Sequence, residues 1–150
     1  MMLYRFVNQR FSQEISGEGS RLFGGRWNSI GIPAVYTSLT ISLALLELLI
    51  HSASYDEIAS NKLMIIDTNL DDITDVKQLK ANWHHDEDYC KFIGDQFLQS
   101  TSKLLLKVPS VIIPEEYNIL INPKHKDFNK VKIKSAKTFE FDSRLFKTKV

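Results

Sequence analysis

Glycine is concentrated in one short segment of this 150-residue chain. Five of the six glycines fall between Gly17 and Gly31. Glycine adopts backbone conformations and permits close approaches that other residues resist. The segment is therefore predicted to be a specialised loop, and residues 7–23 as a whole are polar and expected to be loop-like.

Regular elements are predicted on the C-terminal side of this loop. The hydrophobic pattern indicates a helix from Ser38 or Thr40 to about Ser54, a long amphipathic helix over 86–106 and a short helix near 74–79. It indicates strands over 34–38, 63–66, 108–113 and 117–121, with further strand alternation at 131–133 and 139–141. Because helices and strands do not alternate regularly and several strands cluster late, an α+β fold is favoured.

Length and composition agree with one soluble domain over residues 1–150. The chain is 43% hydrophobic and 25% charged, which supports one sizeable core. Its longest apolar run, residues 43–50, contains Glu47 and is far shorter than the roughly 20 residues of a membrane span. No secretory leader is recognisable at the N-terminus, so a cytoplasmic location is expected.

Charge is distributed unevenly along the chain. Residues 56–88 hold nine acidic and three basic side chains, whereas 124–150 hold nine basic and three acidic ones. Such blocks are either complementary solvated faces, which we favour, or a surface for a charged partner. The tail lysines alternate with Val131, Ile133, Phe139 and Phe141, as on the outer face of a sheet, so direct nucleic-acid binding is not expected.

The glycine-rich segment matches neither standard nucleotide-binding motif. It lacks the lysine of a P-loop, and Leu22 occupies the third glycine position of a dinucleotide fingerprint. Two arginines, Arg21 and Arg26, lie within it, and residues 1–61 contain arginine but no lysine. Guanidinium groups and backbone N–H groups suit an anion such as a diphosphate. A tight turn with salt-bridged arginines is an equally good interpretation.

Glu47 is the most informative single residue. Its helix is otherwise apolar from Leu43 to Ile50, and an unpartnered carboxylate in such a setting costs several kcal/mol. Glu47 is therefore predicted either to form a structural ion pair with an arginine or to work at a cleft. His51, one turn further on, is interpreted first as a helix C-terminal residue and second as a hydrogen-bond partner of Glu47.

Other side chains have a structural and a functional interpretation. Tyr36 on the strand over 34–38 fills the core or stacks on a flat ligand. Ser110 satisfies neighbouring backbone groups or donates to a ligand, and no serine-hydrolase elbow surrounds it. Cys90 is expected to be an idle thiol without a nearby basic partner. His84 and His85 are interpreted as a solvated helix start rather than metal ligands, so no metal site is predicted.

Several linked motifs together resemble the RES domain family. These are the glycine-rich segment over 16–29, the strand over 33–38, the helix over 43–51, the Val-Pro-Ser of 108–110 and the Tyr-Asn-Ile-Leu-Ile-Asn-Pro of 117–123. The resemblance covers about residues 4–128, which leaves residues 129–150 as a lysine-rich, strand-rich extension. The family's arginine, glutamate and serine correspond to Arg26, Glu47 and Ser110.

The resemblance implies a bacterial toxin of a type II toxin–antitoxin pair. It implies an ADP-ribosyltransferase-like fold with a mixed or split sheet, NAD⁺ as substrate, no metal, and a cognate Xre-type antitoxin as partner, with a homodimer among the expected assemblies. The resemblance assigns catalysis to Glu47, Arg26 and Tyr36. NAD⁺ binding is expected from the following residues: Arg5, Arg21, Gly25, Ser110 and Asn118.

Three activities remain open from the sequence. The first is hydrolysis of NAD⁺ at the nicotinamide–ribose bond, with growth arrest as the result. The second uses the same site to pass ADP-ribose to a protein or to phosphate. The third is a binding module without enzymatic activity, in which the basic tail meets an acidic partner.

Overall fold

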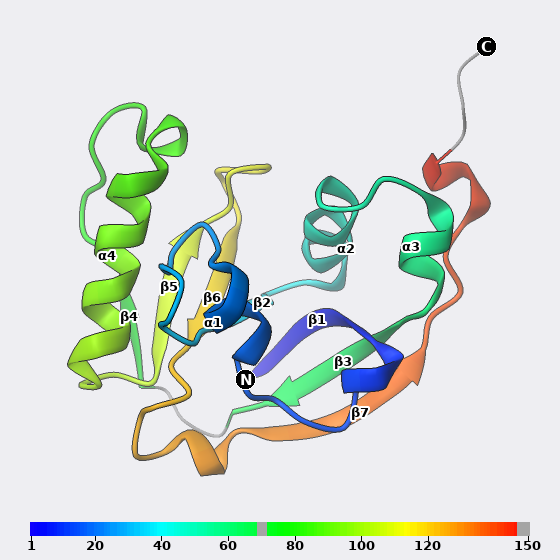
Figure 1. The fold of residues 1–150 in the computed structure, drawn as a ribbon, viewed down its shortest axis with the longest axis horizontal. Coiled ribbons are helices and arrows are strands. Elements are labelled where there is room, and N and C mark those ends of the chain that lie inside the picture. The colour runs from blue at the N-terminus through cyan, green and yellow to red at the C-terminus, as the bar shows by residue number, and fades with distance from the viewer. Residues whose placement is uncertain (69–71, 147–150) are drawn as a thin grey trace.

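Seven strands form one mixed sheet in the order β4-β5-β6-β2-β1-β3-β7 in the computed structural model, which describes residues 1–68 and 72–146 (Figure 1). Neighbouring strands are antiparallel except β4 and β5, which are parallel. The strands are β1 (Met2–Asn8), β2 (Val35–Ser38), β3 (Asn61–Asp67), β4 (Ile73–Asp75), β5 (Leu105–Pro109), β6 (Tyr117–Ile121) and β7 (Lys132–Thr138). The expected α+β fold is confirmed.

Within the described residues, four α-helices accompany the sheet. They are α1 (Glu18–Phe23), α2 (Ile41–Ile50), α3 (Tyr55–Ala59) and α4 (Glu87–Ser100). Short 3₁₀ turns cover Gln9–Phe11, Trp83–His85, Phe128–Lys130 and Ser143–Phe146. In the part of the chain that the structure describes, no helix has the length and apolar character of a membrane span.

The sheet is weakly joined between β2 and β1. These two strands share one register pair, Tyr4 with Ser38, whereas β1 pairs with β3 over seven residues. The sheet thus divides into a β4-β5-β6-β2 half and a β1-β3-β7 half, and Figure 1 shows the two halves splayed apart. Side chains of both halves that lie next to this junction can therefore face the same gap in the sheet.

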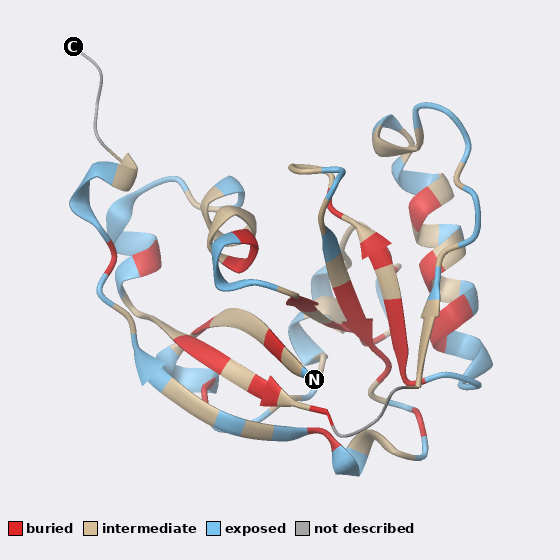
Figure 2. Ribbon diagram, turned by 180° about the vertical axis from the view of Figure 1, so that it is seen from behind, coloured by how far each residue is buried: buried red, intermediate tan, exposed pale blue. Residues whose placement is uncertain are grey.

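Two hydrophobic clusters use opposite faces of the central strands. Leu105, Ile119 and Ile121 belong to a cluster shared with β1, β2 and β3. Leu106, Val108 and Leu120, which alternate with them, pack with Cys90, Phe97 and Leu98 of α4. This period of two is that of strands buried on both faces, and Figure 2 shows β5 and β6 buried along most of their length.

The predictions for β2, α2 and β6 agree with the structure within a few residues. The side chain of Thr40 caps α2 by accepting from the Leu43 N–H at 3.1 Å. The helix nevertheless ends at Ile50, and a separate α3 begins after Ser54, whose hydroxyl caps it. Three of the α-helices and strands were not predicted at all: β1, α3, and α1 in the segment expected to be loop.

Several other expectations were wrong. The strand expected over 108–113 is shifted towards the N-terminus, because β5 ends at Pro109. Residues 73–75 form strand β4 rather than a helix, because they pair with β5. The helix expected over 86–106 ends at Ser100, and Leu105 already begins β5. Phe92, one of the apolar residues of this amphipathic helix, is 62% exposed rather than in the core. Phe139 and Phe141 follow β7 rather than forming a strand, yet their rings pack on Phe6 with centroids 5.0 and 5.4 Å away.

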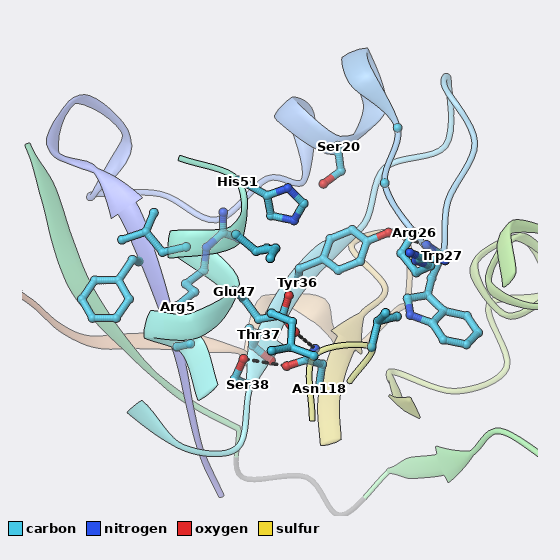
Figure 3. Close-up of a pocket in the computed structure, with 18 of the residues that line it drawn as sticks. Arg5, Ser20, Arg26, Trp27, Tyr36, Thr37, Ser38, Glu47, His51 and Asn118 are labelled. Atoms are coloured by element: carbon cyan, nitrogen blue, oxygen red, sulfur yellow. Dashed lines mark hydrogen bonds between the residues drawn. The ribbon is translucent and has the colours of Figure 1, made fainter. Parts of the chain in front are cut away.

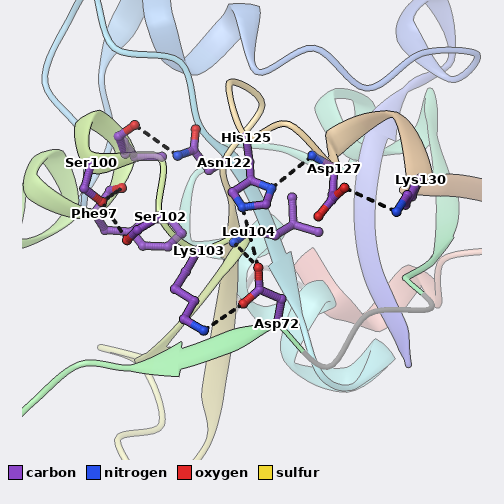
Figure 4. Close-up of polar contacts among 11 residues, drawn as sticks. Asp72, Phe97, Ser100, Ser102, Lys103, Leu104, Asn122, His125, Asp127 and Lys130 are labelled. Atoms are coloured by element: carbon purple, nitrogen blue, oxygen red, sulfur yellow. Dashed lines mark hydrogen bonds and ion pairs between the residues drawn. The ribbon is translucent and has the colours of Figure 1, made fainter.

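Polar contacts around Asp72 fasten the ends of several elements (Figure 4). Asp72 lies just before β4, and its carboxylate pairs with Lys103 at 3.1 Å and contacts His125 Nε2 at 3.5 Å. The same carboxylate also accepts a hydrogen bond from the Leu104 N–H at 3.4 Å, just before β5. His125 is buried, and its Nδ1 accepts from the Asp127 N–H at 3.1 Å. The cluster thereby links β4, β5 and the segment after β6.

Part of the basic block near the C-terminus lies along edge strand β7. Lys132, Lys134 and Lys137 are exposed there, while Ile133 is partly buried against the first cluster. This is the basic strand face that the alternation predicts. Lysines on an edge strand also disfavour pairing with another chain.

Candidate active site

A cavity opens at the junction of β1 and β2 (Figure 3). Its volume is about 720 Å³, within the range of pockets that hold small molecules and cofactors. Three cationic side chains, Arg5, Arg26 and Lys91, and two acidic ones, Glu47 and Glu87, line it. The cavity is thus a charged site with a slight excess of positive charge, suited to an anionic ligand.

Glu47 reaches this cavity because of its place on α2. It follows the buried Leu43 and Ala44 by four and three residues, so it lies on the helix face that packs against the sheet. Glu47 itself is half-buried at the edge of that face. The carboxylate is therefore directed to the cavity while the helix backbone is held by apolar contacts.

Neutral donors hold one oxygen of the Glu47 carboxylate. Asn118 Nδ2 donates to Glu47 Oε1 at 2.7 Å, and Ser110 Oγ donates to the same atom at 3.1 Å. Across residues 1–68 and 72–146, Oε2 has no hydrogen-bond partner and Glu47 forms no ion pair. No cation therefore pairs with the carboxylate within these residues, and one of its oxygens remains available.

The Ser110 hydroxyl is committed to this arrangement. Ser110 is fully buried and does not line the cavity. Its oxygen accepts from the N–H groups of Ile112 and Ile113 at 3.1 and 3.2 Å, so its proton points to Glu47. Asn118 does line the cavity, and its Oδ1 accepts from Ser38 Oγ at 2.7 Å.

Arg26 lines the cavity but does not pair with Glu47. Its Nη1 donates to the His84 carbonyl at 3.1 Å, and its Nη2 lies 3.8 Å from Glu87 Oε1. In the view of Figure 3, Arg26 and Trp27 lie at one end of the pocket and Arg5 and His51 at the other. Arg26 is therefore not the counter-ion of Glu47 in this structure.

Arg5 is the cation near the other end. It comes from the middle of β1, where it is opposite Met64 of β3. Its Nε is buried and has no hydrogen-bond partner in the described chain. Burial also lowers the pKa of Arg5 from its ordinary value. A buried, unsatisfied guanidinium nitrogen is costly, and an anionic ligand would offset that cost.

Tyr36 presents its ring to the cavity and uses its hydroxyl to hold the glycine-rich loop. The hydroxyl donates to Asn28 Oδ1 at 2.6 Å and accepts from the Trp27 N–H at 2.9 Å. Burial is the main reason that the pKa of Tyr36 is raised above its ordinary value, so the hydroxyl stays protonated. The ring is left as the part of Tyr36 that a ligand would contact.

Several N–H groups of the glycine-rich loop donate to carbonyl groups within the loop. The Gly25 N–H donates to the Asn28 carbonyl at 3.0 Å, and the Gly24 N–H to the Ser20 carbonyl at 2.8 Å. A Cβ on Gly25 would lie 2.6 Å from the Tyr36 hydroxyl. Gly25 lines the cavity, and the close approach of Tyr36 explains why a glycine stands there.

Arg21 is not brought to the cavity. It forms a two-pronged pair with Glu18 on α1, with its Nε 2.8 Å from Oε2, and both side chains are largely exposed. Arg21 is therefore salt-bridged, as the second interpretation of the glycine-rich segment predicted. The loop as a whole is held instead by Asn28, a fully buried residue whose Nδ2 donates to the carbonyls of Ser20 and Ile32 at 2.9 and 2.8 Å.

Other expectations about reactive groups can be compared with the structure. Cys90 is buried, and its burial raises the pKa of its thiol, although Arg26 lies near enough to oppose that shift. The expectation that no basic group lies near Cys90 was therefore wrong. Within the described residues, no group of three or more His, Cys, Asp or Glu side chains gathers to hold a metal ion.

Sequence reasoning missed Ser38, Asn28 and Lys91. Ser38 was considered only as a helix cap, and Asn28 only as part of a motif. The available signal was strand alternation: Ser38 is two residues from Tyr36 and so shares its face of the sheet. Lys91 carried no local signal, because only the packing of α4 brings it to the cavity.

Comparisons with known proteins identify the family. The model of the RES domain matches residues 2–142. Two proteins named Toxin Res, from Photorhabdus laumondii and Yersinia enterocolitica, are 38% and 37% identical to this chain, covering 99% and 97% of it and 99% of each relative. A Prs ADP-ribosylating toxin from Sphingobium sp. is 32% identical over 91% of this chain and 89% of its own length.

The fold is found in a solved structure as well. A chain in the crystal structure of the M. tuberculosis MbcT-MbcA toxin-antitoxin complex superposes with a TM-score of 0.73 at 18% identity, covering 90% of this chain and 81% of that one. The sequence and fold comparisons agree over nearly the whole chain. The chain belongs to the RES domain family, whose members include the bacterial proteins named Toxin Res that it matches over nearly their whole length.

Proposed function

We propose that the chain is a toxin that consumes NAD⁺ by hydrolysing the bond between nicotinamide and ribose. The observation that carries this proposal is the state of Glu47. One carboxylate oxygen is held by two neutral donors, and the other has no partner among the described residues and lies in a cavity of about 720 Å³. A structural ion pair would have cancelled this charge.

A negative charge of this kind suits the proposed reaction. When the C1′–N bond breaks, its electron pair leaves with nicotinamide, and positive charge develops on the ribose at C1′ and its ring oxygen. A fixed carboxylate beside that carbon stabilises the charge, as in glycoside hydrolysis. Water then bonds to C1′ and loses a proton, so the products are ADP-ribose, nicotinamide and a proton.

The remaining cavity residues suit the other parts of NAD⁺. The unsatisfied Arg5 is assigned to the diphosphate, because guanidinium groups bind phosphate oxygens in a charge-assisted manner. The Tyr36 ring is assigned to stacking on the nicotinamide. Arg26, held by His84 and Glu87 at the other end, is assigned to a second polar part of the dinucleotide.

The family relationship supports a partner and a location. We assign an Xre-type antitoxin as the protein that neutralises this chain, and the cytoplasm as the place where both meet NAD⁺. The support is that the chain's fold is that of a chain from a toxin-antitoxin complex. No metal has a role in the proposed chemistry.

Transfer of ADP-ribose to a protein is the second candidate. One relative, 32% identical, is named an ADP-ribosylating toxin. The acceptor needs only to reach the same ribose carbon, so the same carboxylate serves both reactions. Inorganic phosphate as acceptor would likewise use this site.

Product analysis separates these reactions. Purified chain is incubated with NAD⁺ in buffer without phosphate, and the products are separated by chromatography with mass detection. Free nicotinamide and ADP-ribose in equal amounts support hydrolysis. Intact NAD⁺ that is cleaved only after phosphate or cell extract is added would replace hydrolysis by transfer, and intact NAD⁺ under all conditions would contradict both.

A further inference from the structure

We propose that Ser38 is a positioning residue for Glu47, acting through the side-chain amide of Asn118. The proposal rests on the proposed function, because it concerns the same carboxylate. Ser38 is 3% exposed at the end of β2. Its hydroxyl donates to Asn118 Oδ1 at 2.7 Å, and Asn118 Nδ2 donates to Glu47 Oε1 at 2.7 Å.

The sheet register creates this chain of hydrogen bonds. Ser38 of β2 is directly opposite Asn118 of β6, and side chains of opposite residues in an antiparallel pair lie on one face. Figure 3 shows the Ser38 and Asn118 side chains meeting below Glu47. Because α2 begins three residues after Ser38, the strand, its neighbour and the helix that carries Glu47 are tied together at one point.

Ser38 and Glu47 together determine which end of the Asn118 amide faces the carboxylate. A hydroxyl carries one proton, and Ser38 donates it to the amide oxygen of Asn118. The amide nitrogen is then directed to the carboxylate, where it acts as a donor. The reverse orientation would set the amide oxygen against a carboxylate oxygen, and two acceptors repel.

As a consequence, the two carboxylate oxygens of Glu47 have different roles. Asn118 and Ser110 both donate to Oε1, so rotation of the carboxylate is opposed by two hydrogen bonds. Oε2 is then the oxygen that faces the substrate. Loss of Ser38 would leave the charge of Glu47 in place but release its orientation, which alters the chemical step more than binding.

Steady-state kinetics of Ser38→Ala tests the proposal. We expect kcat for NAD⁺ cleavage to fall about tenfold, the effect of one hydrogen bond of ordinary strength, with KM changed less than twofold. Ser38→Cys, which keeps a weak donor of similar size, is expected to give an intermediate kcat. Ser12→Ala is the matched control, since it removes another buried hydroxyl. The Ser12 hydroxyl donates to the Gln9 carbonyl at 2.9 Å, and Ser12 does not line the cavity.

A double-mutant cycle distinguishes positioning from direct contact. If Ser38 acts through Asn118, Ser38→Ala has no further effect on kcat in an Asn118→Ala background. Additive effects of the two substitutions would overturn the proposal. A raised KM with unchanged kcat would also overturn it, because that result indicates that Ser38 contacts the substrate itself.

An activity-independent measurement separates this proposal from the proposed function. The side-chain amide resonances of Asn118, assigned by their loss in Asn118→Ala, are compared in spectra of the folded proteins. We expect them to shift in both Ser38→Ala and Glu47→Gln and to stay unchanged in Ser12→Ala. If the wild type cleaves no NAD⁺, the proposed function fails, and unchanged amide resonances in Ser38→Ala would overturn the positioning role on their own.

Discussion

At the scale of single residues, two charges that line the cavity, those of Glu47 and Arg5, have no counter-ion among the described residues. Glu47 is fixed by Ser110 and Asn118, which are neutral, and Arg26 is held by His84 and Glu87. Arg5 keeps a buried Nε without a partner. The unpaired charges of Glu47 and Arg5 lower the stability of the ligand-free protein. Both charges are available to a dinucleotide. This pattern is typical of a functional site rather than of a packed core.

Arg5→Met should weaken binding without weakening the fold. We expect KM for NAD⁺ to rise tenfold or more, because a charged hydrogen bond contributes about 1.5–3 kcal/mol. The thermal midpoint should stay equal or rise, since an unsatisfied cation is replaced by an apolar side chain. Arg10→Met, an exposed arginine outside the cavity, serves as the control and should alter neither value. A marked fall in the midpoint with unchanged KM would show that Arg5 is structural.

At the scale of elements, local signals predicted what lies close together in the sequence. The capping side chain of Thr40 and the apolar run after it predicted where α2 begins, and apolar residues bounded by polar ones predicted β6. Residues 73–75 were mistaken for helix because their strand character comes from pairing with β5, about thirty residues away. Among site residues, Glu47 was identifiable as a charge in an apolar helix, whereas Ser38 needed the register of β2 on β6.

The contact between α4 and the glycine-rich loop depends on Gly94. A Cβ at this position would lie 1.7 Å from the Trp27 carbonyl oxygen, so the helix and the loop would have to separate. Asp95 next to it holds the loop by accepting from the Ser29 N–H at 2.9 Å. The loop that carries Arg26 is therefore docked on α4 through a site that admits no side chain.

Gly94→Ala should destabilise the protein by about 3 kcal/mol or more, because overpacking against backbone cannot be relieved by a side-chain rotation. Gly19→Ala is the matched control. A Cβ there meets nothing within 4 Å, and Gly19 lies within α1, so alanine should be neutral or slightly stabilising. Urea unfolding measures both. Equal stabilities of the two variants would contradict this account of the contact.

At the scale of the whole molecule, the weak junction of β1 with β2 opens the sheet where the site forms. Arg5 comes from one half of the sheet, Tyr36 and Asn118 from the other, and Glu47 from the helix that follows β2. The two halves are held together through the shared hydrophobic cluster. The contacts of Asp72 stabilise the β4-β5-β6-β2 half itself, at the far ends of its strands. The stability of the fold and the geometry of the site thus depend on the same contacts between strands that are far apart in the sequence.

Asp72→Asn should reveal a pH-dependent part of the stability. The hydrogen bond from Lys103 is the main reason that the pKa of Asp72 lies below its ordinary value. A carboxyl whose pKa is lower in the folded than in the unfolded state stabilises the fold above the unfolded pKa, and this contribution disappears as the pH falls through the folded pKa.

We therefore expect Asp72→Asn to lower the free energy of unfolding by about 1 kcal/mol or less at pH 7, since the pair is partly exposed. The difference between the two proteins should shrink towards pH 3. Urea unfolding at both pH values measures it. A difference that grows on acidification would contradict the assigned cause of the pKa shift.

The most direct test of the central claim is a comparison of Glu47→Gln with the wild type in both NAD⁺ cleavage and NAD⁺ binding. The amide has the size of the carboxylate but no charge, so we predict that kcat falls about 100-fold or more while the dissociation constant for NAD⁺ changes less than threefold. Cleavage by Glu47→Gln at the wild-type rate would contradict the claim that the free carboxylate oxygen of Glu47 stabilises the reacting ribose.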